Sequence, residues 1–344
     1  MLISIENLHF CYGINEIFND LNLSIQEKEM IGLVGRNGSG KSTFLKLLAG
    51  LLIPDSGSIN KKSNLSVGYL AQEAAFPPDQ TLNEIFTSVF SPLIKMEERL
   101  REMEHQIGTV SGDTLEKLMK NYGELQDRFS EENGYEYPSR IRGIAKGLNF
   151  TETDLNKPFA VLSGGEKTRA ALGHILLLSP ELLLLDEPTN YLDIDSLSWL
   201  EQYLKSYSGA FVIISHDRYF LDKVCGRILE VSRHSLDSYA GNYSTYVEKK
   251  EKMLMDQDHL YAQQMREFNR QKEMIARFRR YNSVHSSKRA ASREKALAKM
   301  EIVDKVQTDS TAHFNFKPRI QSGKDVLLVS DISKSFGDKT LFKD

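Results

Sequence analysis

The sequence predicts a mixed α/β fold in which strands and helices alternate, extended by long charged helices. Three observations support this class. The apolar run at residues 30–34 leads into a glycine-rich loop and then into a helical pattern at 43–52. A second apolar run, at residues 182–185, has the character of a buried strand. It ends in two acidic residues. Charged segments with helical spacing occupy residues 93–129 and 244–305.

The loop after the first strand is a candidate phosphate-binding loop. Residues 35–42 read GRNGSGKS and fit G-x-x-x-x-G-K-[ST] in a strand–loop–helix context. Glycines there let backbone N–H groups approach phosphate oxygens, Lys41 would reach the β and γ phosphates, and Ser42 would ligate Mg²⁺. The sequence therefore predicts nucleotide contacts from Gly35, Arg36, Asn37, Gly38, Ser39, Gly40, Lys41, Ser42 and Thr43.

The second apolar strand supplies the acidic groups that phosphoryl transfer needs. Asp186 and Glu187 end it, before Pro188. A carboxylate beside a phosphate loop can hold Mg²⁺, and a second one can polarise the attacking water. On its own, the pair also fits a charged strand end before a proline turn. The phosphate loop in the same chain favours the functional interpretation.

Residues 162–166 read LSGGE and carry two interpretations at once. Ser163 and Glu166 have the spacing of a capping box, and an amphipathic helical pattern follows from 167 to 178. Such a helix start leaves N–H groups that could hold the γ-phosphate of a nucleotide bound to another domain. The residues concerned are Ser163, Gly164, Gly165 and Glu166.

The order of these motifs, with GYLAQE before LSGGE and SHDRYFLD after LLLLDEPTN, resembles an ABC-type ATPase domain over about residues 1–242. The resemblance implies ATP and Mg²⁺ as cofactors, with Tyr12 stacking on adenine, Gln72 sensing the metal and the attacking water, and His216 contacting the γ-phosphate. It also implies that Asp186 holds the metal and that Glu187 is the catalytic carboxylate.

Alternatives stay open for three of these residues: Tyr12 as a core or turn aromatic, Gln72 as a surface amide and His216 as an ordinary loop histidine. The resemblance places Ser163 and Gly165 on a nucleotide bound by the opposite domain. Residues 189–193 read TNYLD where many members of one subfamily of these ATPases read TNHLD. Tyr191 is therefore a departure at a loop that communicates across the dimer, which leaves open how the two sites are coupled.

Composition fits a large cytosolic protein. The 344 residues are 40% hydrophobic and 26% charged, enough for a sizeable core plus extensions. No apolar run approaches the roughly eighteen residues that a membrane span needs. Cys11 and Cys225 have no spacing typical of a metal site, and a cytosolic setting disfavours a disulfide.

A helical arm is expected as an insertion at about 88–135. Apolar residues recur at helical spacing from Leu93 to Ile107, and the pattern breaks at 108–112 before resuming. We therefore expect an antiparallel helical pair. A solvated hairpin without a partner remains the alternative.

A basic helical linker is expected from 243 to 322. The window 264–305 holds twelve Lys or Arg against five Asp or Glu, within a chain of formal net charge −3. Segregated positive charge with aromatic residues at a turn is typical of nucleic-acid binding, although a solvated linker or an anionic membrane surface would share the charge. The candidate RNA contacts are Arg277, Phe278, Arg279, Arg280, Tyr281, Lys288 and Arg289.

The chain's end repeats its beginning. Residues 329–344 align without a gap on residues 5–20, which predicts that a second ATPase domain starts at about 323. We expect the chain to stop shortly after that start, leaving the opposing signature loop to a second copy arranged head to tail, and ATP hydrolysis to be weak in this chain alone.

The arrangement of two ATPase domains, a long basic linker and no membrane segment resembles the ABC-F family, as do HSSKRAASREKALAKME and AGNYSTY. The resemblance implies action on ribosomes, with the linker near peptidyl-tRNA and ATP turnover governing binding and release. It implies that the protein is either a general translation factor or a resistance protein that displaces antibiotics from the ribosome. An ATPase subunit of a membrane transporter and a DNA-linked ABC ATPase remain alternatives.

Overall fold

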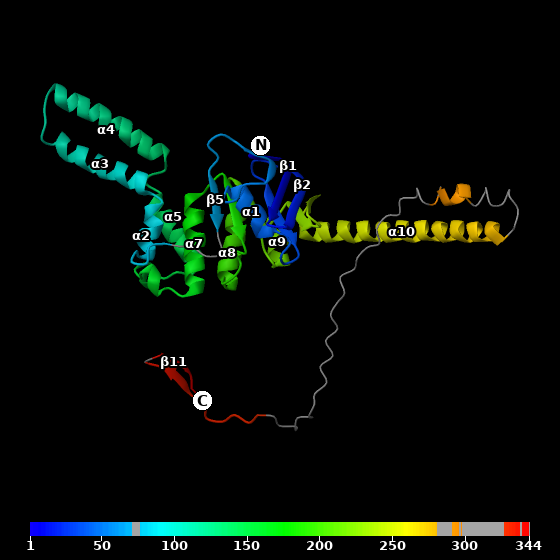
Figure 1. Cartoon of the computed structure of the whole chain (residues 1–344). Helices are drawn as coiled ribbons and strands as arrows, with labels where there is room; N and C mark the ends of the chain where they lie inside the picture. The colour runs from blue at the N-terminus through cyan, green and yellow to red at the C-terminus, as the bar shows by residue number, and fades with distance from the viewer. Residues whose placement is uncertain (71–75, 281–290, 296, 298–326, 338, 344) are drawn as a thin grey trace. The chain divides into compact units, whose positions relative to one another are not determined.

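The computed structural model describes residues 1–70, 76–280, 291–295, 297, 327–337 and 339–343, and within 278–280 it describes the backbone only. The chain divides into two units, Met1–Met253 and Leu254–Asp344. Within the first unit a mixed α/β body is formed, as the sequence predicts (Figure 1).

The centre of the first unit is a six-stranded sheet of order β5-β6-β7-β3-β8-β9. All neighbouring pairs are parallel except β8 and β9. The inner strands are apolar almost throughout because helices or a second sheet cover both faces. The strands are β3 (Met30–Gly35), β5 (Val67–Leu70), β6 (Leu182–Asp186), β7 (Ala210–Ile214), β8 (Arg227–Ser232) and β9 (Ser235–Ala240).

A second, three-stranded antiparallel sheet packs over the first with helix α1 (Lys41–Ala49). It has the order β2-β1-β4, where β1 is Ile3–Tyr12, β2 is Asn15–Ile25 and β4 is Ser56–Lys61. The shared core includes fully buried Phe18 and Phe44, whose rings meet edge to face with centroids 5.9 Å apart. This core fixes the start of α1, and with it the loop that precedes α1.

Helices form the other face of the sheet and its helical subdomain (Figure 1). One apolar cluster joins these helices to β6, β7 and β8 through residues such as Phe86, Leu148 and Leu176. The helices are α2 (Leu82–Ser88), α5 (Tyr137–Gly147), α6 (Glu152–Leu155), the 3₁₀ turn η1 (Phe159–Val161), α7 (Gly164–Leu178), α8 (Ile194–Lys205) and α9 (Arg218–Val224).

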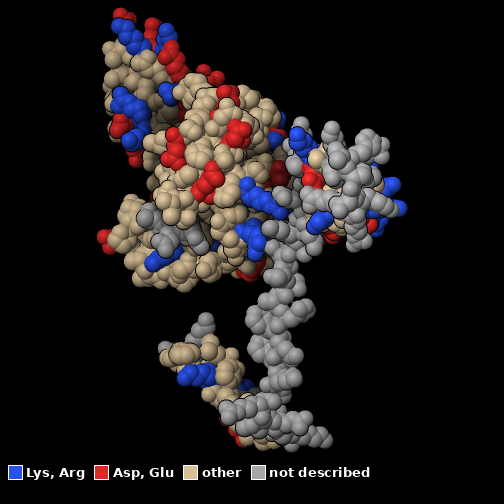
Figure 2. Space-filling view, turned by 45° about the vertical axis from the view of Figure 1, so that its right-hand side comes forward, with Lys and Arg blue, Asp and Glu red and all other residues tan. Residues whose placement is uncertain are grey.

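The expected helical arm consists of α3 (Ser91–Ile107) and α4 (Asp113–Glu131), which lie side by side (Figure 1). Tyr122 donates a hydrogen bond across the pair to Glu104 at 2.8 Å. The outer faces carry both charge signs, with ion pairs within each helix, such as Arg99–Glu102 and Arg128–Glu132 (Figure 2). Exposed pairs of this kind contribute little to stability, so Leu100, Met103 and Phe129, which are buried, hold the arm together.

Helix α10 (Tyr243–Arg280) begins in the first unit and continues into the second. In the second unit, residues 291–295 are helical, and Arg293 donates a hydrogen bond at 2.9 Å to Gln271 on α10. Ile275 is buried at this contact region. The described parts of the linker are therefore helical, and residues 291–295 lie against α10.

The end of the chain forms a hairpin of β10 (Lys334–Phe336) and β11 (Lys339–Phe342). Its pairs, Lys334↔Phe342, Ser335↔Thr340 and Phe336↔Lys339, repeat residue for residue the first hairpin's pairs Phe10↔Phe18, Cys11↔Glu16 and Tyr12↔Asn15. Backbone conformation repeats as well, because φ is +57° at Gly337 and +60° at Gly13. The repeat seen in the sequence therefore extends to local structure.

Candidate nucleotide-binding site

The candidate site residues gather where the central parallel strands end. In the order β6-β7-β3, the loops after these strands carry Glu187, His216 and the phosphate loop respectively. Ligands of open parallel sheets bind outside the carboxyl ends of the strands. Asp186 pairs with Ile214 across β6 and β7, which brings residues far apart in the sequence into one edge of the sheet.

The phosphate loop is shaped by left-handed backbone at its glycines. Gly38 and Gly40 have φ of +78° and +103°, a region that favours glycine. A Cβ at Gly40 would lie 2.5 Å from Ile17 Cγ2, whereas one at Gly38 would meet nothing within 4 Å. Lys41 Nζ donates to the carbonyl oxygens of Gly35 and Arg36 at 3.0 Å each, so its ammonium lies across the loop.

This loop fits a phosphate group. Gly40 caps α1 without a side chain, so the first N–H groups of the helix remain available to an anion. Ser39 Oγ is buried and has no hydrogen-bond partner among the described residues, which leaves a donor for a bound oxygen. Ser42 is exposed at the helix start, where its hydroxyl could reach a metal ion.

Glu187 is held in an uncommon conformation beside His216. Its φ is +52°, and its N–H donates to Ile214 O at 3.0 Å. A non-glycine residue in this region carries strain that surrounding contacts must offset, and such residues cluster at functional sites. The backbone N–H of His216 donates to Glu187 Oε2 at 3.3 Å, and His216 Nε2 lies 3.3 Å from Glu187 Oε1.

Burial is the largest influence on the Glu187 carboxyl and raises its pKa; the nearby Asp186 charge adds to this. His216 and Lys41 act in the opposite direction. Burial and Asp186 also raise the pKa of Tyr69 to about 12. A carboxyl whose pKa is raised by burial is the kind of group that acts as a general base near neutral pH.

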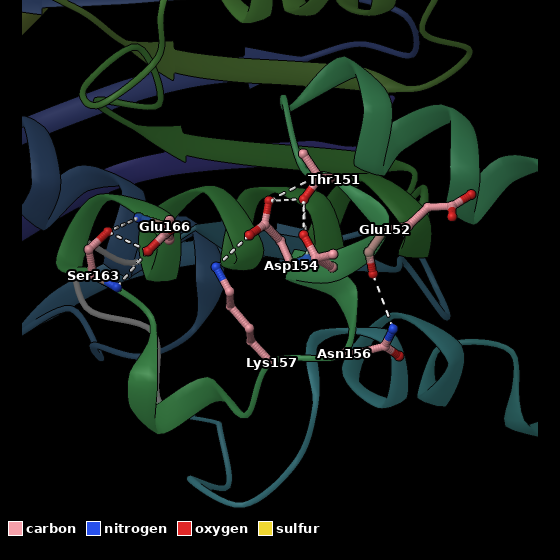
Figure 3. A network of polar contacts seen from close by, with 8 residues as sticks. Thr151, Glu152, Asp154, Asn156, Lys157, Ser163 and Glu166 are labelled. Atoms are coloured by element: carbon pink, nitrogen blue, oxygen red, sulfur yellow. Dashed lines mark hydrogen bonds and ion pairs between the residues drawn. The ribbon is translucent and has the colours of Figure 1, made fainter. Parts of the chain in front are cut away.

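The LSGGE segment forms the capping box that its spacing predicts (Figure 3). Ser163 Oγ and Ser163 N both donate to Glu166 Oε2 at 2.7 Å, and these bonds lower the pKa of Glu166. A second capping box, Thr151 with Asp154, lies beside it. Lys157 Nζ contacts Asp154 at 2.7 Å and adds to the lowering of the Glu166 pKa.

Residues 18–190 match the ABC transporter family, and residues 229–316 match an extension domain described in the same words. The chain belongs to the ABC transporter family of ATP-binding domains. Such domains bind ATP with Mg²⁺ and hydrolyse it, and the phosphate loop described above is the candidate for that site in this chain. When bound, Mg²⁺ would neutralise phosphate charge; Ser42 and Asp186 are the described residues proposed to hold it.

Curated relatives match this ABC ATPase over nearly all its length. A putative ATP-binding protein of Bacillus subtilis, YdiF, is 41% identical over 98% of this chain and 52% of its own. ABC transporter F family member 5 of Arabidopsis thaliana is 35% identical over 99% of this chain and 50% of its own length. The energy-dependent translational throttle protein EttA of Escherichia coli is 33% identical over 95% of this chain and 58% of its own length. The chain thus spans about half the length of these relatives.

Solved structures agree on the fold. The ATP-binding subunit of an ABC transporter superposes with a TM-score of 0.52 at 19% identity, covering 70% of this chain and 90% of that one. A dimeric bacterial ABC transporter cassette superposes with a TM-score of 0.51 at 23% identity, covering 70% of this chain and 98% of that one. In the described part of the ABC ATPase chain, no helix has both the length and the apolar character needed to cross a bilayer.

One further predicted residue is a surface aromatic, and several others fall outside the described residues. Tyr12 is 47% exposed at the end of β1, with its ring edge-on to Phe10 at 5.0 Å, so it is a surface aromatic and not a core residue. Gln72 lies outside the described residues. The same holds for Tyr281, Lys288 and Arg289, and for the side chains of Phe278, Arg279 and Arg280.

Tyr191, which stands where the pattern TNHLD has histidine, lies against the signature loop of its own domain. A Cβ added at Gly165 would be 3.3 Å from Tyr191 Cβ, and Tyr191 itself has a φ of +67° and is 68% exposed. Asn149 Nδ2 donates at 2.7 Å to Asp193, which caps α8. These contacts tie the loop after β6 to the helical subdomain that carries LSGGE.

Sequence patterns missed several residues that organise the site. Thr189 Oγ1 and Ser215 Oγ lie 3.0 Å apart and join the loops after β6 and β7, and Ser215 accepts a hydrogen bond from Asp217 N. Asp217 in turn caps α9. The local sequence signals only the cap, because the Thr189–Ser215 contact depends on the neighbouring positions of two strands in the sheet.

Proposed function

We propose that this chain is part of a cytoplasmic ABC-F protein that acts on the ribosome. In this proposal, binding of ATP closes a clamp between two ATPase domains and sets the basic linker near peptidyl-tRNA. Hydrolysis then opens the clamp and releases the protein. The result would be regulation of translation or displacement of ribosome-targeting antibiotics.

The observation that carries this proposal is the extent of the similarity. EttA, named a translational throttle, and an Arabidopsis F family member align over 95% and 99% of the chain. The alignment therefore includes the linker and not only the ATPase domain. A relative that shared the ATPase domain alone would support the family but not a common use of the linker.

The charge of the linker supports an RNA partner. Part of α10 belongs to the second unit, which starts at Leu254. Along this part, the described basic side chains that are exposed are those of Arg266, Arg270, Lys272 and Arg277. Lys and Arg contacts to phosphates displace counterions and give strong, salt-dependent affinity. These exposed basic side chains support an RNA partner for the linker.

Each nucleotide in the proposed clamp is held between the phosphate loop of one domain and the signature loop of the other. Asp186 and Gln72 are proposed to hold the metal with Ser42. Glu187 accepts a proton from the attacking water, and His216 positions the γ-phosphate and the Glu187 carboxylate. Ser163, Gly164, Gly165 and Glu166 act on the nucleotide of the opposite domain, supplied either by a second domain or by a head-to-tail copy.

The test is co-sedimentation with ribosomes in sucrose gradients, using a two-domain form of the protein that carries Glu187→Gln. With ATP, this variant should migrate with the ribosomal peak, and without ATP it should remain at the top. Lys41→Ala in the same background should abolish the ATP-dependent shift. Absence of co-migration under both conditions would reject the ribosomal role and favour a transporter subunit or a DNA-linked ATPase.

A further inference from the structure

The first turn of α10 is capped by a residue from another helix. Asp222 Oδ1, on α9, accepts a hydrogen bond from Ser244 N at 2.7 Å. Asn242 Oδ1 accepts from the next N–H, that of Thr245, at 3.1 Å. Asn242 is the local cap that many helices have. Asp222 adds a negative charge at the helix start, where the helix dipole favours an anion.

The same short helix begins at the nucleotide site. Asp217, which follows His216 directly, caps α9 by accepting from Phe220 N at 3.0 Å. Asp222 follows on α9 little more than a turn later. The N-cap residue of α9 therefore follows the proposed γ-phosphate contact directly, and Asp222 of the same helix bonds to the first turn of the linker helix.

Helix α9 is held as a rigid element. Phe220, Leu221 and Val224 are each at most 2% exposed, so the helix is packed into the core along its apolar side. Its end is closed as well, because Cys225 N donates to Leu221 O at 3.0 Å. A packed helix moves as a unit and does not bend to absorb a displacement at one end.

Other contacts join α10 to the sheet, and Tyr246 belongs to the same apolar cluster as Phe220 and Leu221 of α9. Lys250 contacts Glu230 of β8, and Lys249 Nζ donates to Ala240 O at the end of β9. Tyr246 packs edge to face on Tyr239 of β9 at 5.0 Å. Among the hydrogen bonds of the described residues, the bond from Ser244 N to Asp222 joins the start of α10 directly to α9, the helix that follows His216.

We propose that Asp222 is a positioning residue that transmits nucleotide binding at His216 to the start of the linker helix. A nucleotide that engages His216 would shift α9, and Asp222 would carry that shift to the first turn of α10. This inference rests on the proposed function, in which nucleotide state sets the linker's pose. It names the residue through which that setting occurs.

The experiment is amide hydrogen exchange on this chain, with and without a non-hydrolysable ATP analogue and Mg²⁺. The measured region is the first turn of α10, from Tyr243 to Val247. In the unaltered chain, nucleotide should change the exchange rate there by about threefold or more, since local opening responds to small changes in contact energy. In Asp222→Ala, that nucleotide response should disappear.

Two variants separate coupling from simple helix capping. Asp222→Asn retains an acceptor oxygen and should keep a reduced response. Asp237→Ala removes an exposed carboxylate from β9 and should leave the response intact. Loss of the cap alone would speed exchange in Asp222→Ala equally with and without nucleotide, leaving the ratio between the two conditions unchanged.

Two results would overturn the proposal. One is a full nucleotide response in Asp222→Ala. The other is no response in the unaltered chain under conditions in which a fluorescent ATP analogue is bound. If Asp222→Ala does not fold, the comparison of Asp222→Asn with the unaltered chain decides, because an undiminished response there contradicts the coupling. Ribosome co-sedimentation is a separate measurement, so its failure would reject the ribosomal role without altering the exchange result.

Discussion

His216 contacts Glu187 twice, through its backbone and through its ring. The His216 N–H donates to Glu187 Oε2 at 3.3 Å, while His216 Nε2 lies 3.3 Å from Oε1. The two residues lie on the loops that follow the adjacent strands β6 and β7. The backbone bond fixes one carboxylate oxygen, while the buried Oε1 has no hydrogen-bond partner among the described residues and so keeps an acceptor for a water molecule.

Glu187→Gln should lower the rate of ATP hydrolysis by about 100-fold or more, because the amide cannot accept the proton. ATP affinity should change little, since the phosphate loop is untouched. Steady-state phosphate release and equilibrium nucleotide binding measure the two quantities. Glu98→Gln, on the exposed face of α3, is the matched control. Unaltered turnover in Glu187→Gln would reject the assignment.

Stability should depend on pH through Glu187 in the nucleotide-free chain. Burial raises the pKa of this carboxyl above its ordinary value of 4.5, so the folded state holds its proton to higher pH than the unfolded state does. The contribution is therefore fully present below pH 4.5 and is lost as pH rises through the raised pKa. Glu187→Gln does not undergo this loss.

Thermal melting from pH 4 to pH 8 checks the sign. The melting temperature of Glu187→Gln minus that of the unaltered chain should grow with pH, by on the order of 2 °C. Glu98→Gln should give a difference that does not grow. A difference that shrank with rising pH would mean that His216 and Lys41, and not burial, dominate at this carboxyl.

The two capping boxes offer a matched pair of variants. Ser163→Ala and Thr151→Ala each remove one cap, so each should lower the free energy of unfolding by about 1 kcal/mol. In a two-domain form, only Ser163→Ala should also reduce hydrolysis, at the nucleotide bound to the opposite domain. Denaturant melts and turnover measure the two effects. An equal loss of activity in Thr151→Ala would mean that the signature loop acts only through helix stability.

Gly40→Ala should destabilise the fold by about 1–3 kcal/mol. Its backbone has φ of +103°, and the new Cβ would lie 2.5 Å from Ile17 Cγ2. Gly123→Ala, within α4, meets nothing within 4 Å and should stabilise the arm by about 0.5–1 kcal/mol. Urea unfolding measures whether each variant lowers or raises the free energy of unfolding. Equal stability of both variants would argue that the loop can relax around an added methyl group.

Reversing the charge of Arg279, Arg280, Lys288 and Arg289 should weaken ribosome binding and reduce its salt dependence, because fewer phosphates would be neutralised. ATP affinity, measured in the same variant, serves as the internal control and should be unaffected. Equal loss of ribosome binding and ATP affinity would indicate that these residues support the structure and do not contact RNA.

The sequence by itself determined the fold class, the phosphate loop, the buried strand ending in Asp186 and the LSGGE capping box. These features are local: glycine spacing, apolar runs and capping residues act over a few neighbouring positions. The repeat of the first hairpin at the chain's end was equally readable, and the structure reproduces its register.

Only the tertiary structure decided how these pieces meet. The strand order β6-β7-β3 places Glu187 beside His216, and no local pattern encodes which strands become neighbours. Burial, and with it the raised pKa of Glu187, is likewise a property of the packed core. The bond from Ser244 N to Asp222 joins two helices separated by a strand hairpin. Such contacts arise from long-range packing, in which each side chain's partner is set by the whole sheet and not by its neighbours in sequence.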